Sequence, residues 1–72
     1  MFIKLTTVGH YSLDDNTFET KNVYVNVKNI NYLKDITGDY GNIELNTVIT
    51  FDDSWIEVVE SIDDIIKKIN KE

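Results

Sequence analysis

The residues that could carry acid–base chemistry in this chain are one histidine and several acidic side chains. His10 is the only histidine and is followed by Tyr11 and Ser12. Neighbouring side chains of a strand point to opposite faces, so this run does not form a catalytic triad. Nucleophilic catalysis also needs an oriented base beside the nucleophile, and no such spacing is present. We therefore expect no catalytic residue and no enzyme, with His10 at the surface or in contact with a ligand.

The acidic side chains are candidates for a hard-cation site, because Ca²⁺ and Mg²⁺ prefer oxygen ligands. None of them has EF-hand spacing, and acids in a turn commonly serve only to solvate it. The turn-like TGDYG, residues 37–41, lacks the spacing of a phosphate-binding loop. We expect neither a metal nor a cofactor. The acids weighed are Asp14, Asp15, Asp35, Asp39, Asp52, Asp53 and Glu57.

Aromatic side chains are the strongest indication of a binding surface, since rings can stack on a nucleobase or anchor a protein partner. Tyr24 alternates with Val23 and Val25, so its ring is expected to face outward, whereas Trp55 is assigned to the core. The alternative is that the rings cover the sheet or fill a subunit interface. The residues expected to contact a ligand or partner are His10, Tyr11, Phe18, Tyr24, Tyr32 and Tyr40.

The net charge of −6 disfavours direct nucleic-acid binding, because phosphate neutralisation by basic residues supplies most of that affinity. An acidic protein could instead approach a basic partner or imitate DNA, or its acidity could simply keep it soluble. The candidate acidic surface for a DNA mimic consists of Asp52, Asp53, Glu57 and Glu60.

The chain of 72 residues predicts one small domain without disulfides, because it contains no cysteine. A chain this short buries only about 60% of its unfolded surface, so we expect a homo-oligomer to supplement the core. No apolar run approaches the ~20 residues of a membrane span. The start, MFIKLTT, lacks the long apolar region of a signal peptide. We expect a cytoplasmic protein with no membrane partner.

Alternating apolar residues predict five strands, and the last apolar stripe predicts a helix. Ser61 and Asp64 form a capping box at the start of that helix. The stretch around residues 29–36 suits either a helical turn or a bent strand, and we favour the strand. The predicted fold is α+β: a mainly antiparallel five-stranded meander closed by one C-terminal helix. The expected elements are strands 2–8, 23–27, 29–36, 42–51 and 55–60, a hairpin or long loop 9–22, and a helix 62–70.

Three stretches resemble the FlbD family of flagellar and swarming-motility proteins: IKLT, VYVNVKNINYL and NTVITFDDSWIEVVESIDDIIKKI. The family pattern includes a V/L-N-x-x-x-I step, found here as Val25, Asn26 and Ile30, and V-x-E-S, found at residues 58–61. The resemblance implies an accessory role on a larger motility or regulatory machine. The family's short N-G-K turns are replaced here by residues 8–22 and 52–54. The segment VYVNVKNINYLKDI with S-x-x-D-I is also similar to half of a LytTR domain, without its basic residues.

The composition points to an AT-rich bacterial or phage genome, since Asn, Ile and Lys are abundant while Arg, Pro, Ala and Gln are absent. Small acidic proteins on such scaffolds look like phage accessory proteins, which include host-defence inhibitors that act by binding. We therefore expect a non-enzymatic binding protein that holds a host protein or sequesters a nucleotide-type signal. The alternatives are an FlbD-like motility accessory protein and an acidic DNA mimic.

Overall fold

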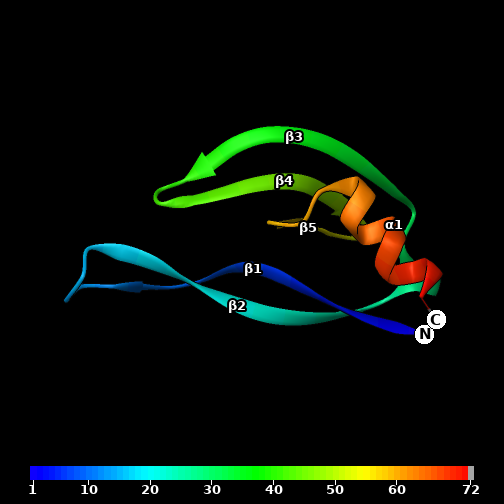
Figure 1. The fold of residues 1–72 in the computed structure, drawn as a ribbon, viewed down its shortest axis with the longest axis horizontal. Coiled ribbons are helices and arrows are strands. Elements are labelled where there is room, and N and C mark those ends of the chain that lie inside the picture. The colour runs from blue at the N-terminus through cyan, green and yellow to red at the C-terminus, as the bar shows by residue number, and fades with distance from the viewer. Residues whose placement is uncertain (72) are drawn as a thin grey trace.

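The computed structural model describes residues 1–71 and has five strands and one C-terminal helix (Figure 1). The α+β class, the antiparallel pairing and the closing helix are confirmed. Nothing in residues 1–71 forms a helix long and apolar enough to cross a membrane. The elements are β1 (Phe2–Ser12), β2 (Thr17–Asn26), the 3-10 turn η1 (Val27–Asn29), β3 (Tyr32–Tyr40), β4 (Ile43–Thr50), β5 (Trp55–Val58) and α1 (Ile62–Asn70).

The strands form two separate hydrogen-bonded sheets, β1–β2 and β3–β4–β5. The prediction of a single five-stranded meander is therefore wrong in this respect. Figure 1 shows the twisted β1–β2 hairpin as one layer and the curved β3–β4 hairpin as the other, with β5 between them and α1 at the end where the chain termini lie. β5 has four residues and pairs only with β4, so no continuous ladder joins it to β1. The two sheets still meet there, because Val59 N donates to Thr6 O at 2.9 Å.

The sequence left residues 9–22 as either a hairpin or a long loop, and the structure shows a hairpin. Both arms of this hairpin are β-strand. β1 and β2 pair from Phe2–Asn26 to Ser12–Thr17, with a bulge between Val8 and Tyr11. The turn occupies residues 13–16, where Asn16 adopts a positive φ of 55°. Most of residues 9–22 therefore lengthen the two paired strands of the hairpin, and only residues 13–16 form a turn.

The predicted strand 29–36 is wrong at both ends. Residues 27–29 form η1 instead, because Asn26 Oδ1 accepts a hydrogen bond from Lys28 N and starts a turn. β3 then runs through the predicted TGDYG turn to Tyr40, since a bulge between Asp35 and Gly38 lets the strand bend and continue. The chain reverses only at residues 41 and 42. The final strand also ends at Val58, two residues earlier than predicted.

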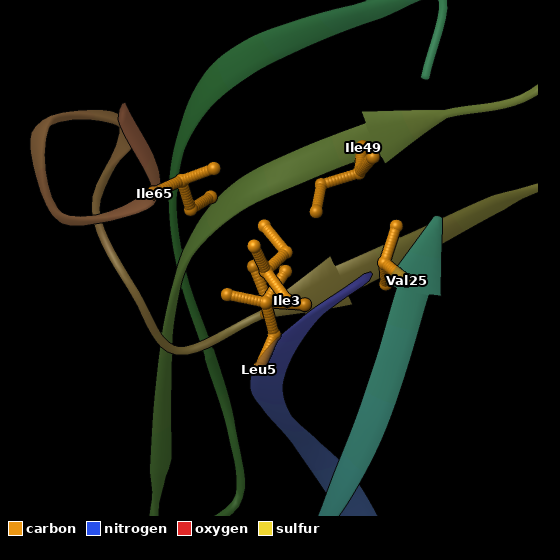
Figure 2. Close-up of a cluster of buried hydrophobic side chains, with 6 residues drawn as sticks. Ile3, Leu5, Val25, Ile49 and Ile65 are labelled. Carbon is orange, nitrogen blue, oxygen red and sulfur yellow. The ribbon is translucent and has the colours of Figure 1, made fainter. Parts of the chain in front are cut away.

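The hydrophobic core lies between the two sheets and under the helix (Figure 2). Figure 2 shows Ile65 of α1 pointing toward Ile49 of β4 and Ile3 of β1. The predicted N-cap is confirmed, because Ser61 Oγ accepts from Asp64 N at 3.2 Å. A helix of nine residues is not stable alone in water, so burial of Ile65 is what holds it. The buried cluster is Ile3, Leu5, Val25, Ile49, Val58 and Ile65.

The assignment of Trp55 to the core is wrong. Its side chain is 66% exposed. Along β5 the side chains alternate, and Val58 is fully buried with Ile56 on the same face. Trp55 and Glu57 therefore point away from the core.

Candidate functional site

The outer face of the β3–β4–β5 sheet carries a row of three side chains with an aromatic ring at each end. Thr50 of β4 is paired with Tyr32 of β3 on one side and with Trp55 of β5 on the other. Directly opposed residues of antiparallel strands share a face of the sheet. Trp55 and Tyr32, 58% exposed, therefore stand on the solvent side with only Thr50 between them.

A second row on the same face is mixed in charge. Val48 lies between Lys34 of β3 and Glu57 of β5. We call the six residues of the two rows the aromatic face: Tyr32, Lys34, Val48, Thr50, Trp55 and Glu57. Part of this face, with Ile36 and the turn at residues 52–54, lines an open hollow of about 550 Å³. That volume falls within the range of small-ligand sites and also suits the side chains of a protein partner.

The turn at residues 52–54 is held in place at the rim of the aromatic face. Asn31 Nδ2 donates to Asp52 Oδ1 at 3.1 Å, and Phe51 N donates to Ser54 O at 2.8 Å. Asp52 and Asp53 both remain exposed and line the hollow. The face thus has two outward rings on either side of Thr50, with Val48 in the next row and an acidic rim.

Glu60, the fourth residue of the predicted acidic surface, lies elsewhere. Its Oε1 accepts from Thr6 N and its Oε2 from Thr6 Oγ1, each at 2.9 Å. The side chain is partly buried between the end of β5 and β1. Glu60 therefore joins the two sheets, and the exposed acids of the set are Asp52, Asp53 and Glu57.

Three of the predicted contact residues form a cluster where the two hairpin tips meet. The Phe18 ring packs edge-on against Tyr11, with centroids 4.8 Å apart, and against Tyr40, at 4.7 Å. Asn42 Oδ1 accepts from Phe18 N at 2.7 Å while its Nδ2 donates to Phe18 O at 3.1 Å. We call Tyr11, Phe18, Tyr40 and Asn42 the tip cluster, and its geometry fits a structural tie between the hairpins.

A second pocket lies between the start of β1, the facing part of β2 and the C-terminal end of α1. Lys4 of β1 is paired with Tyr24 of β2, and Phe2 lies two residues along on the same side. Ile3 of β1 also lines the pocket, as do Lys68 and Lys71 of the helix end, and the volume is about 340 Å³. We call Phe2, Lys4, Tyr24, Lys68 and Lys71 the basic pocket.

The remaining candidates form no further site. His10 is exposed within the bulged part of β1. Residues 1–71 contain no group of three or more His, Cys, Asp or Glu side chains that could hold a metal ion. Asp14 and Asp15 are exposed in the turn between β1 and β2.

Sequence reasoning placed Tyr24 outward and expected Tyr32 to contact a partner, but it missed the neighbours of both residues. Trp55 could have been found by giving Ile56 and Val58 priority as the inward residues of a two-residue period. Lys68 and Lys71 could not have been found from the sequence, because nothing in the order of residues indicates that they approach Phe2 and Tyr24. Apart from His10, the predicted contact residues are therefore spread over three places: the aromatic face, the tip cluster and the basic pocket.

Comparison with protein-family models gave no match, and neither did comparison with curated proteins or with solved structures.

Proposed function

We propose that this chain is a non-enzymatic binding protein and that its aromatic face anchors a partner protein. The observation that carries this proposal is the pair of exposed rings, Tyr32 and Trp55, on either side of Thr50. Tryptophan and tyrosine are enriched among the residues that supply most of the energy of protein–protein interfaces. Exposed apolar groups that gather on one part of a sheet mark an interaction site more strongly than single exposed residues do.

The acidic rim favours a partner with a basic surface. Asp52, Asp53 and Glu57 border the rings, and the whole chain carries a net charge of −6. Complementary charge at a rim speeds association and selects the partner, while buried aromatic anchors supply most of the affinity. Lys34 is the one basic residue of the face and would lie beside an acidic or polar group of the partner.

The partner we propose is a host protein of an AT-rich bacterium. This step rests on the composition, which suggests a phage or bacterial origin, and on the likeness to small phage proteins that inhibit by binding. Covering a functional surface of a larger protein needs no chemistry from the chain itself. An FlbD-like accessory role would use the same face on a different target.

The test is a comparison of two variants of equally exposed aromatic residues. Trp55→Ala removes an anchor of the aromatic face, and Tyr24→Ala removes a ring that is 69% exposed on the other sheet. A host protein captured by the wild-type chain is purified, and its affinity for each variant is measured by calorimetry. We expect Trp55→Ala to weaken binding about 30-fold or more, equivalent to about 2 kcal/mol, and Tyr24→Ala to leave it unchanged.

The salt dependence of the same complex separates anchoring from DNA mimicry. A DNA mimic binds through charge, so its affinity falls steeply with ionic strength and depends little on Trp55. An aromatic anchor keeps most of its affinity at high salt. Binding that is lost with salt but insensitive to Trp55→Ala would contradict the proposal.

A further inference from the structure

Three of the seven lysines of this acidic chain line one pocket. Lys4 comes from β1, whereas Lys68 and Lys71 come from the last turn and the end of α1, more than sixty residues later. Lysines at a helix C-terminus complement the helix dipole, which alone explains their presence on α1. It does not explain why a third lysine from another element lies at the same hollow. Three lysine side chains that line one hollow favour an anion there.

The same pocket has two aromatic rings on its wall. Phe2 is 62% exposed and Tyr24 is similarly exposed, and both project from the outer face of the β1–β2 hairpin. Because Tyr24 pairs with Lys4, Phe2 and Tyr24 are diagonal neighbours, and such side chains are about 7–8 Å apart at their Cα atoms. That separation allows a flat group to stack on one ring or to enter between the two. The pocket thus combines anion-binding groups with surfaces for a planar ring.

We infer that the basic pocket, formed by Phe2, Lys4, Tyr24, Lys68 and Lys71, binds a mononucleotide. The lysines would hold the phosphate and the two rings would stack on the base, as aromatic side chains do in single-strand binding proteins. The volume of about 340 Å³ lies at the lower end for small-molecule sites, which suits one nucleotide. A nucleic-acid polymer is disfavoured, because its further phosphates would meet a chain of net charge −6.

This site is separate from the aromatic face, so either can fail without the other. The aromatic face lies on β3–β4–β5, and the basic pocket lies on β1–β2 and α1. A nucleotide bound there would make the chain a ligand-sequestering protein as well as a protein-binding one. No chemical step on the nucleotide is required.

The experiment is an NMR titration of the full chain, using backbone amide signals, with adenosine monophosphate, inorganic phosphate and adenosine as separate probes. We expect adenosine monophosphate to shift the signals of Phe2, Lys4 and Tyr24, with a dissociation constant of about 1 mM or tighter. Phosphate alone and adenosine alone should each bind at least about tenfold more weakly, because each lacks half of the contacts.

Variants locate the effect. The double variant Lys4→Gln/Lys68→Gln should weaken binding of adenosine monophosphate at least about tenfold, and Tyr24→Ala should do the same through the ring. The matched controls are Lys34→Gln and Trp55→Ala, which change the aromatic face and should bind like the wild type. All of these side chains are at least partly exposed, so the amide spectrum should show retained folding in each variant.

Several results would overturn the inference. It fails if adenosine monophosphate shifts no signals at millimolar concentration, or shifts those of the aromatic face instead. It also fails if phosphate alone binds as tightly, because the rings then contribute nothing. Tighter binding of a short oligothymidylate than of the mononucleotide would make the pocket part of a nucleic-acid groove and would equally exclude a mononucleotide site.

Discussion

The side-chain amide of Asn42 pairs with the backbone of Phe18, a residue 24 positions away in the chain. Both the N–H and the C=O of Phe18 are engaged, so the contact imitates one step of a β-ladder between the two hairpin tips. The Phe18 ring then packs between Tyr11 and Tyr40. This tie explains how a long β1–β2 hairpin keeps a fixed position far from the main core.

Replacing Asn42 by alanine should loosen the tip cluster without unfolding the chain. Two exposed neutral hydrogen bonds contribute about 1–2 kcal/mol together, so urea unfolding should show a loss of that size. Hydrogen exchange of the Phe18 amide should also become faster. The control is Asn22→Ala, which changes an exposed asparagine of β2. If both variants behave alike, the rings hold the tips together without the amide.

Gly41 should be sensitive to substitution by alanine, whereas Gly38 should not. Gly41 has a φ of 62°, and a Cβ placed there would lie 2.6 Å from Cδ2 of Phe18. Left-handed strain costs about 1–2 kcal/mol, and displacement of the ring adds to it. A Cβ on Gly38 meets no atom within 4 Å. Thermal unfolding should show a clear loss for Gly41→Ala and a change within about 0.5 kcal/mol for Gly38→Ala.

A double variant separates the two causes of the Gly41 effect. In a Phe18→Ala background the ring is gone, so Gly41→Ala should cost only the backbone strain. Equal losses with and without the ring would show that Phe18 does not crowd this turn.

The Glu60–Thr6 contact should be a major link between the two sheets. The Glu60 carboxylate accepts two hydrogen bonds from Thr6, and hydrogen bonds to a charged group contribute about 1.5–3 kcal/mol. We expect Glu60→Ala to lower the free energy of unfolding by about 2 kcal/mol, and Glu60→Gln to lower it less. Glu57→Ala, an exposed acid of β5, is the control and should change stability by about 0.5 kcal/mol or less.

A thermodynamic cycle with Thr6→Val tests whether Glu60 acts through Thr6. If it does, the losses of the two single variants should sum to more than the loss of the double variant, because each single change already removes the same side-chain hydrogen bond. Additive losses would mean that Glu60 stabilises the chain through other contacts.

Trp55 should be nearly neutral for stability although it is the largest side chain of the protein. Because it is exposed, Trp55→Ala should change the free energy of unfolding by about 0.5 kcal/mol or less. Ile49→Ala removes a fully buried side chain of the neighbouring strand and should cost about 2–5 kcal/mol. Acrylamide should quench the fluorescence of native Trp55 efficiently. Weak quenching or a large loss of stability would show that the indole is buried, for instance between copies of the chain.

Local signals in the sequence determined the strand alternation, the capped helix and the position of the inward isoleucines. These depend on contacts between residues a few positions apart, so the order of residues is enough to predict them. Ser61 and Asp64 do form the cap. Alternation also places Thr47 on the face of Ile49, where it is fully buried, and its hydroxyl donates to Glu60 O at 2.8 Å, a partner that the pattern does not indicate.

Only the tertiary structure decided which residues meet across the chain. The division into two sheets, the Asn42–Phe18 tie and the convergence of Lys4 with Lys68 and Lys71 all join segments that are remote in sequence. The orientation of Trp55 was also decided by the tertiary structure. Val58 is buried in the core, and the alternation along β5 then directs Trp55 to solvent. The hydrophobic effect is non-directional. The pattern of a strand therefore indicates which side chains will be buried, but it does not indicate which other element they will pack against.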